Sequence, residues 1–283
     1  MSAEHSIVAL CAALEVTPAG YHAWARAEPG ARERADAELA EKIAAVHRAH
    51  RGRYGAPRIQ RELSAHGQRH SRKRIARLMR VRGLGGRCAR RWVPRTTESN
   101  HSEPIAPNRM AGRPAPTGRD QVWVSDLTYV PTAEGWLYAA VVLDRWSRRV
   151  IGWACASNLG AADTALAALR MVLRHRRPPR GLLHHSDRGV QYACADHRTL
   201  LAAAGIEPSM SRPGNPYDNA AMESWMATYK RECVALAEET GGYATRAQAT
   251  AGFFDYVEAY YNRVRLHSAL GYQSPVDFEN QLN

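Results

Sequence analysis

The chain of 283 residues is long enough for one or two domains, and its 45% hydrophobic and 23% charged residues are typical of a globular protein. No apolar run reaches the roughly 18 residues that a membrane-spanning helix needs, and no basic segment precedes the apolar N-terminal stretch, so we expect neither a membrane protein nor a signal peptide. The five cysteines are odd in number and widely spaced, which argues against a disulfide framework and favours a reducing cytoplasm.

The formal net charge of +12 comes entirely from the first part of the chain. Residues 1–120 hold 23 Lys and Arg against 11 Asp and Glu, whereas residues 121–283 hold 16 of each kind. Within the first part, residues 46–95 hold 16 basic residues and one acid, Glu62. A run of charged residues can simply be a solvated face of the protein. At this density, however, the positive side chains repel one another unless a polyanion neutralises them. This density therefore predicts binding to nucleic acid.

The first 92 residues are predicted to be helical, with helices over 5–28, 35–50, 53–67 and 70–84. Thr17 and Ser71 are the expected N-caps, and Pro18 is suited to a first helical position. Two short basic helices joined by a Gly-containing turn are typical of a helix-turn-helix, whose second helix can enter the major groove. The predicted DNA contacts on these helices are Arg58, Arg61, Arg72, Lys73, Arg74, Arg77 and Arg80. The alternative is a basic hairpin that contacts only phosphates, and the sequence leaves both open.

Residues 93–118 hold five prolines and little apolar material, which predicts an extended linker. We therefore expect three parts: a helical DNA-binding region (1–92), the linker (93–118) and a second domain (119–283). In the second domain the pattern predicts strands at 121–131, 135–147, 149–157, 181–187 and 206–211, and helices at 160–176, 191–204, 218–233 and 245–263. Three successive strands with short connections form an antiparallel meander. The whole order predicts an α/β fold with a mixed sheet, of ribonuclease-H-like type.

Three acidic residues fall where such a fold can bring them together. Asp187 ends a predicted buried strand, Asp126 lies inside the first strand, and Glu223 lies in the helix that is expected to begin with Asp218 as its N-cap. Lys230 follows seven residues after Glu223 and shares its helix face. Clustered carboxylates repel one another unless a hard cation neutralises them, and oxygen ligands suit Mg²⁺ or Mn²⁺. Taken singly, each acid is equally compatible with a structural role.

The segments around these residues resemble, in order, the integrase core of bacterial insertion-sequence transposases of the DDE and retroviral-integrase-like superfamily, most closely the OrfB product of a two-frame element. The spacing agrees, because 60 residues separate Asp126 from Asp187 and 35 separate Asp187 from Glu223. The upstream region resembles the helix-turn-helix segment of the same proteins. The segments that carry the resemblance are "WVSDLTYVPTAEGWLYAAVVLDRWSRRVIGW", "HHSDRGVQY", "SMSRPGNPYDNAAMESWMATYKREC", "YYNRVRLHSALGYQSP", "RYGAPRIQRELSAHGQRHSRKRIARLMRVRGL" and "LCAALEVTPAGYHAW".

The resemblance implies a transposase that binds the ends of the element and performs metal-dependent strand cleavage and strand transfer. Asp126, Asp187 and Glu223 match the metal-binding catalytic triad, which would hold two Mg²⁺ or Mn²⁺ ions. Lys230 matches a basic residue expected to contact DNA near the scissile phosphate. Other motif positions are Asp218 and Asn219, with an expected role as cap and loop anchor, and Asp144, an alternative metal ligand at the wrong spacing. His185 has an open role, either catalytic or packed beside the site.

The expected partners are double-stranded DNA, both element ends and target, and further copies of the chain on that DNA. Partnership or fusion with the upstream-frame product is a further expectation, and the expected location is the bacterial cytoplasm, at the nucleoid. His66 and His70 precede Cys88, but no second cysteine follows at zinc spacing, so no structural zinc is expected. Two competing functions are a non-catalytic DNA-binding protein and a plain metal nuclease of ribonuclease-H type.

Overall fold

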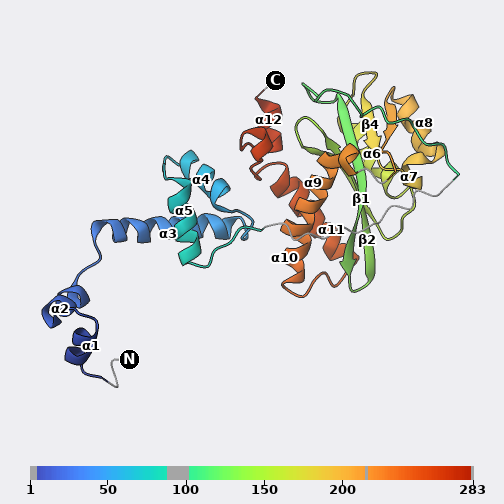
Figure 1. Cartoon of the computed structure of the whole chain (residues 1–283). Coiled ribbons are helices and arrows are strands. Elements are labelled where there is room, and N and C mark those ends of the chain that lie inside the picture. The colour runs from blue at the N-terminus through green and yellow to red at the C-terminus, as the bar shows by residue number, and fades with distance from the viewer. Residues whose placement is uncertain (1–4, 88–101, 214–215, 282–283) are drawn as a thin grey trace. The chain divides into compact units, whose positions relative to one another are not determined.

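The computed structural model describes residues 5–87, 102–213 and 216–281, and it divides the chain into two compact units, Met1–Gly86 and Arg87–Asn283. Figure 1 labels the elements of both units along the chain. Across these described ranges, every helix is too short or too polar to cross a membrane. The predicted linker residues 93–101 lie outside the described ranges, and so does Cys88.

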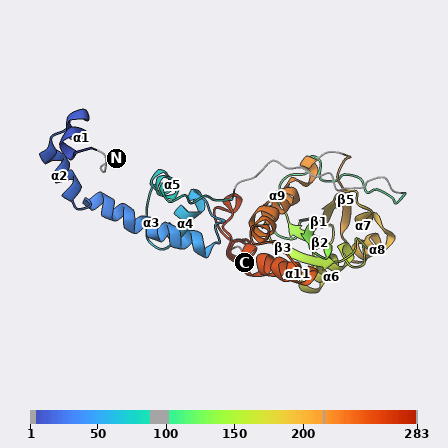
Figure 2. The same cartoon turned by 90° about the horizontal axis from the view of Figure 1, so that it is seen from below.

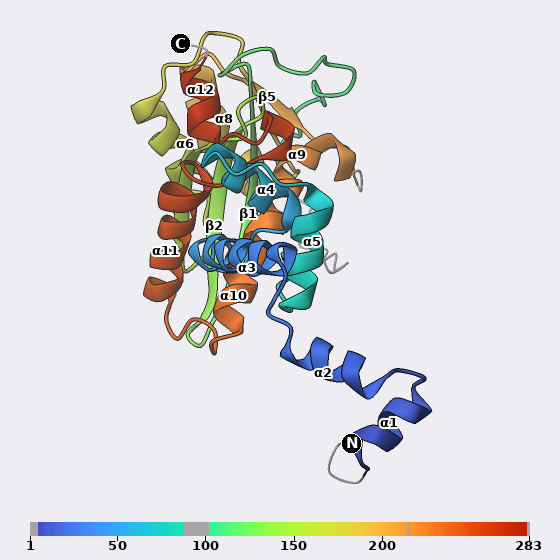
Figure 3. The same cartoon turned by 90° about the vertical axis from the view of Figure 1, so that its left-hand side faces the viewer.

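The first unit is entirely helical in its described residues. Its helices are α1 (Ile7–Ala13), α2 (Pro18–Arg26), α3 (Ala31–Ala49), α4 (Ala56–Ala65) and α5 (Arg72–Val81). Helices α3, α4 and α5 pack together around buried Ile43, Ile59 and Ile75 (Figure 3). The expected N-caps are confirmed, because the Thr17 and Ser71 side chains accept hydrogen bonds from the third backbone N–H beyond each cap.

The second unit is built on one mixed five-stranded sheet. Its strands are β1 (Val122–Thr132), β2 (Gly135–Asp144), β3 (Val150–Ala156), β4 (Leu183–Ser186) and β5 (Glu207–Met210). They lie in the order β3-β2-β1-β4-β5. The first three strands form the predicted antiparallel meander, and β4 and β5 add to it in parallel. The mixed sheet with its ribonuclease-H-like element order is therefore confirmed.

Helices cover both faces of this sheet (Figure 2). The helices of this unit are α6 (Ala165–His175), α7 (Val190–Ala193), α8 (Ala195–Ala203), α9 (Ala220–Tyr229), α10 (Ala235–Glu238), α11 (Arg246–Phe254) and α12 (Pro275–Asn280), of which α6, α8, α9 and α11 contact strands of the sheet. On one face, Gly152 lets α6 approach so closely that a Cβ there would lie 2.3 Å from Val172 Cγ2. On the other face, the ring of Trp153 contacts Phe253 of α11 at 5.3 Å between centroids.

Two predicted helices differ in detail from the structure. The helix predicted at 218–233 is a 3₁₀ turn, η1 (Pro216–Asn219), then α9, then a π-helical segment, η2 (Lys230–Val234). The final long helix is α11 continued by a second π-helical segment, η3 (Asp255–Tyr261). A π-helical segment is rare, and the α-helical period used for the prediction assumes i→i+4 hydrogen bonds throughout, so the sequence pattern did not separate these segments from the helices that they continue.

Residues 102–118 belong to the second unit and contain no helix or strand, but they are bound to the rest of that unit. Met110 is buried, the Arg109 N–H donates to Ser209 Oγ at 2.9 Å, and the Asn108 side chain donates to Asp218 at 2.8 Å. This part of the predicted linker is thus packed extended chain.

Candidate active site

Asp126 and Asp187 lie side by side on neighbouring strands. Strands β1 and β4 pair in parallel, and the last paired residues are Val124 and His185. Continuing the same register by two residues sets Asp126 beside Asp187, the first residue after β4. Both side chains are half-buried. The strand pairing therefore brings together two acids that lie 60 residues apart in the sequence.

The two aspartates repel each other. Burial raises the pKa of Asp126 well above its usual range, and the negative charge of Asp187 raises it further. The Leu127 N–H, which donates to Asp126 Oδ1 at 2.8 Å, opposes this shift only in part. Asp187 is held by a hydrogen bond from the Gly189 N–H at 3.0 Å. Two carboxylates that destabilise each other's charge form a donor set suited to a hard divalent cation.

Helix α9 lies along the edge of β1 that extends beyond β4. Asn219, at the start of α9, donates from its side chain to the Ser125 carbonyl at 3.2 Å. At the far end of the helix, the Lys230 ammonium donates to the carbonyl of Tyr129. Residues four apart on a strand direct their carbonyls to the same edge, and β4 ends too early to pair with this part of β1. The helix is thus fastened to the strand at both ends.

Glu223 projects from this helix one turn after Asn219. Its charge contributes the smallest of the effects that raise the pKa of Asp126, whereas its own raised pKa is due to burial alone. Glu223 therefore acts on Asp126 more weakly than Asp187 does, and Glu223 is exposed. Among residues 5–87, 102–213 and 216–281, no three His, Cys, Asp or Glu side chains are grouped closely enough to hold a metal ion.

Asp218 is not the N-cap of α9, contrary to expectation. Its carboxylate forms an ion pair with Arg212 at 2.9 Å and accepts from the Asn108 side chain, which ties two loops together. Asn219 occupies the N-cap position but makes no side-chain capping bond. Its side chain serves instead as the loop anchor to β1 described above, in agreement with the structural role expected for this motif.

His185 is a packed side chain between strands. It is fully buried, and its ring nitrogens form hydrogen bonds with Ser209 Oγ at 2.9 Å and Ser211 Oγ at 3.0 Å. Burial lowers its pKa to about 4, so the ring is neutral at physiological pH. Both ring nitrogens are thus occupied within the protein, which favours the packed alternative over a direct catalytic role.

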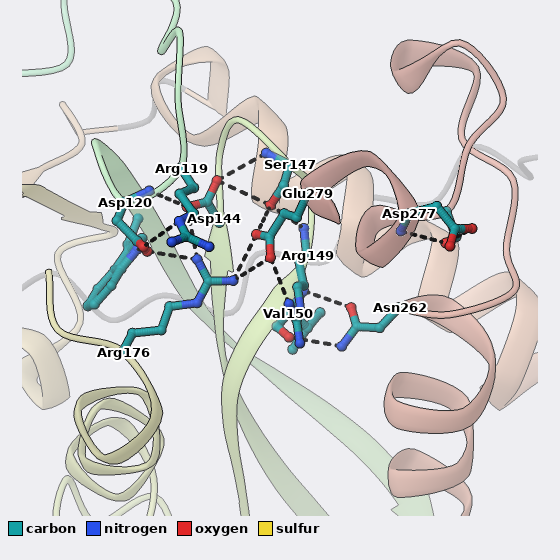
Figure 4. Close-up of polar contacts among 12 residues, drawn as sticks. Arg119, Asp120, Asp144, Ser147, Arg149, Val150, Arg176, Asn262, Asp277 and Glu279 are labelled. Carbon is teal, nitrogen blue, oxygen red and sulfur yellow. Dashed lines mark hydrogen bonds and ion pairs between the residues drawn. The ribbon is translucent and has the colours of Figure 1, made fainter. Parts of the chain in front are cut away.

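Asp144 is the centre of a buried polar network that also contains Asp120 and Glu279 (Figure 4). It pairs with Trp123 across β1 and β2, three residues before Asp126. Its carboxylate accepts from the backbone N–H groups of Asp120, Trp146 and Ser147. With its lone pairs already occupied and no exposed surface, Asp144 is not an alternative metal ligand.

A second carboxylate in the same network, Glu279 of α12, was not anticipated from the sequence. It is 3% exposed and accepts from Arg149 Nη1 at 2.7 Å and, through both of its oxygens, from Arg176 Nη2 at 2.8 Å. Arg176 also forms an ion pair with Asp120 at 2.8 Å. The network joins residues more than 100 positions apart, so only the fold reveals it.

The predicted DNA contacts of the first unit fall into two groups. Arg74 and Arg77 both form ion pairs with Asp36 of α3, at 2.7 and 2.5 Å, and so hold α5 against α3. Arg61, Arg72, Lys73 and Arg80 are exposed, while Arg58 is half-buried over the ring of Tyr54. Free positive charge on α5 is therefore concentrated on Arg72, Lys73 and Arg80.

Family models of integrase cores and of an HTH-like domain match the chain. The integrase core domain matches residues 116–216, a second integrase core model matches residues 204–275, and an HTH-like domain matches residues 33–92. The catalytic core of bovine immunodeficiency virus integrase superposes with a TM-score of 0.42 at 18% identity, covering 58% of this chain and 95% of that one.

Two curated relatives match over nearly the whole chain. A 31 kDa protein of insertion element IS600 from Shigella sonnei is 41% identical and covers 96% of this chain and 98% of its own length. Transposase InsF of insertion sequence IS3A from Escherichia coli is 37% identical and covers 99% and 96%. On the strength of these matches, the chain belongs to the family of insertion-sequence transposases that includes InsF, with an HTH-like domain followed by an integrase core.

Proposed function

We propose that Asp126, Asp187 and Glu223 are the catalytic residues of this transposase, and that they cut and join DNA with divalent metal bound between them. The observation that supports this most directly is the juxtaposition of Asp126 and Asp187 on neighbouring strands, where each raises the cost of charging the other. A bound Mg²⁺ or Mn²⁺ pair would supply Lewis acid chemistry, since two ions can stabilise the attacking and leaving oxygens of a phosphodiester.

The chain's own residues hold the parts of this site in place. Asp126 lies on a central strand and Asp187 on the turn after its neighbour, so two ligands are fixed by the sheet. Glu223 is carried by a helix that Asn219 and Lys230 fasten to the same strand. In this proposal the Glu223 side chain turns toward the aspartates to complete the set of metal ligands. No nucleophilic side chain is needed, because water and then a DNA 3′-OH act as nucleophiles.

The first unit supplies the affinity for duplex DNA in this proposal. Its α4 and α5 form the helix-turn-helix, and the exposed basic residues of α5 face outward from the packed side with Ile75 and Leu78. The ligands are the ends of the element and the target DNA. We further propose that copies of the chain assemble on this DNA and that the upstream-frame product joins them. The expected place of action is the bacterial nucleoid.

The test is a DNA cleavage and joining assay with the variant Asp187→Asn. This change replaces the carboxylate by a neutral amide of nearly the same shape. The variant is expected to bind DNA as the wild type does and to lose cleavage in Mg²⁺ or Mn²⁺ by at least a thousandfold, a range typical of essential catalytic groups. Asp196→Asn, the same change at an exposed position of α8, is the matched control and is expected to stay active.

Two outcomes would favour the competing functions. Wild-type protein that hydrolyses DNA but never joins strands would indicate a plain nuclease. Wild-type protein that binds DNA with no metal-dependent cleavage at all would indicate a non-catalytic DNA-binding protein. An active Asp187→Asn variant would contradict the assignment of the catalytic residues.

A further inference from the structure

The turn between β2 and β3 carries three arginines that differ in their partners. Arg149 forms an ion pair with Glu279 at 2.7 Å. Within the described part of the chain, Arg145 and Arg148 have no carboxylate partner, and neither has the exposed Arg113. The nearby acid Asp144 is occupied by backbone N–H groups and by Arg176. Three positive charges of this region therefore remain unneutralised.

These three charges lie close together. The pKa of Arg145 is lowered first by burial and then by the positive charges of Arg148 and Arg113. In addition, Arg145 Nη1 is buried and has no acceptor among the described residues. A buried guanidinium N–H without a partner is unfavourable, and crowded like charges add to the cost. An anion beside the accessible parts of these side chains would relieve the crowding of like charge.

The backbone of the turn is held firmly in a shape that does not favour arginine. Arg148 has a φ of 60°, in the left-handed region. Glycine adopts this conformation at a lower conformational energy than a residue with a Cβ. Its carbonyl accepts from the Tyr261 hydroxyl at 3.0 Å, and its N–H donates to the Asp144 carbonyl at 2.9 Å. A strained arginine where glycine would fit better points to a use for its side chain.

The cluster lies beside the two strands that carry Asp126 and Asp187. The Arg145 N–H donates to the Val122 carbonyl of β1, four residues before Asp126. Four residues of strand span roughly 13 Å, which corresponds to about four base steps of a DNA strand.

We propose that Arg113, Arg145 and Arg148 form a phosphate-binding site for the DNA backbone a few nucleotides from the bond that reacts. Guanidinium groups match phosphate oxygens in a two-pronged geometry, and the exposed Arg113 and the partly exposed Arg145 and Arg148 offer such groups to a phosphate. The inference rests on the proposed catalytic role of Asp126 and Asp187. If these residues act on DNA, the DNA backbone is the polyanion that lies near the three arginines.

The test measures binding of the full chain to a short duplex of arbitrary sequence over a series of salt concentrations. The variants are Arg145→Gln and Arg148→Gly, with Arg170→Gln as the control, which removes the same charge from an exposed position on α6 across the sheet. Each cluster variant is expected to lower the slope of log K against log salt by about 0.9, the value for one lost phosphate contact, and the control to leave it unchanged.

Arg148→Gly also separates binding from folding. Glycine suits the left-handed backbone at this position, so the melting temperature of the Arg148→Gly variant is expected to equal or exceed that of the wild type. The DNA affinity of the variant is expected to fall several-fold. Wild-type slopes for both cluster variants would overturn the inference, and an acidic protein segment would then be the better ligand for the cluster. This test is independent of the test of the catalytic proposal. Asp187→Asn is expected to lose cleavage while the slope of log K against log salt stays at the wild-type value.

Discussion

The ammonium group of Lys230 donates a hydrogen bond to the backbone carbonyl of Tyr129, on the strand that carries Asp126. This bond forms where α9 passes into the π-helical segment η2. The sequence suggested a DNA contact for Lys230, and that role stays a prediction. In the structure, the group joins the helix of Glu223 to the strand of Asp126, so its effect on catalysis can act through the position of Glu223.

Replacing Lys230 by Met is expected to change the pH dependence of stability. Burial lowers the pKa of Lys230 to about 8, below its usual 10.5. Between those values the unfolded chain holds a proton that the folded protein has released, so this group makes stability rise with pH in that window, by at most about 3 kcal/mol. Urea unfolding of wild type and Lys230→Met at pH 7 to 10.5 measures the difference. Parallel curves would contradict the buried position.

Asp187→Asn and Asp144→Asn are expected to have opposite effects. Without divalent metal, Asp187→Asn removes repulsion from Asp126 and raises the free energy of unfolding by about 1 kcal/mol, while abolishing cleavage. Asp144→Asn weakens a buried acceptor of several N–H groups and lowers stability by about 1–3 kcal/mol, while its folded fraction still cleaves DNA.

Adding Mg²⁺ gives a further test of the variants Asp187→Asn and Asp144→Asn. Mg²⁺ at a hundredfold excess over its Kd stabilises a protein by about 2.7 kcal/mol. We expect thermal unfolding to show this gain for the wild type and for Asp144→Asn, and not for Asp187→Asn. A metal-induced shift that survives Asp187→Asn would place the ion elsewhere.

The proximity of Asp126 and Asp187 was predictable from the sequence because spacing and strand pattern carry the information, and their catalytic role stays a prediction. Asp126 and Asp187 each sit on or just after an apolar run, and a mixed sheet places such runs side by side. Asp144 also ends an apolar run, and the pattern alone gave no reason to treat it differently from Asp187. Its buried partners come from backbone N–H groups and from Arg176, and only tertiary structure brings these together.

The contacts of α9 were beyond sequence reasoning for a similar reason. A Lys seven residues after Glu223 shares a helix face with it, but whether that face meets solvent, DNA or a strand edge depends on where β4 ends. Because β4 is only four residues long, it leaves the far half of β1 open to α9. Strand length at this level of detail does not follow from hydrophobic periodicity.

The exposed basic residues of α5 are expected to dominate the salt dependence of DNA binding by the first unit. Arg72→Gln, Lys73→Gln and Arg80→Gln should each lower the slope of log K against log salt by about 0.9. Arg77→Gln breaks an ion pair with Asp36 and is expected to change the slope less. Fluorescence anisotropy with a labelled duplex checks this, and equal effects at all four positions would contradict it.

His197 is expected to contribute to acid instability of the core. Its ring is buried between His184 and Tyr192, at 5.3 and 5.5 Å between centroids, and burial lowers its pKa to about 4. Between pH 6.5 and 4 the unfolded chain binds a proton that the folded protein does not, so stability falls as pH decreases through this window, by up to about 3 kcal/mol. His197→Phe keeps the aromatic packing and should give a shallower acid limb in thermal unfolding, whereas an unchanged limb would contradict the assignment.

Glu279 is expected to be essential for holding the C-terminal helix α12 to the sheet. It compensates Arg149 and Arg176 in a buried setting, and removing one partner of a buried ion pair costs about 3–5 kcal/mol because the other charge is left unpaired. Glu279→Gln should therefore unfold at markedly lower urea concentration, whereas Glu207→Gln, at an exposed position of β5, should not. Arg149 also lies in the turn with Arg145 and Arg148. The folded fraction of Glu279→Gln should therefore bind DNA with altered salt dependence. An unaltered salt dependence would show that the turn keeps its shape without the ion pair to Glu279.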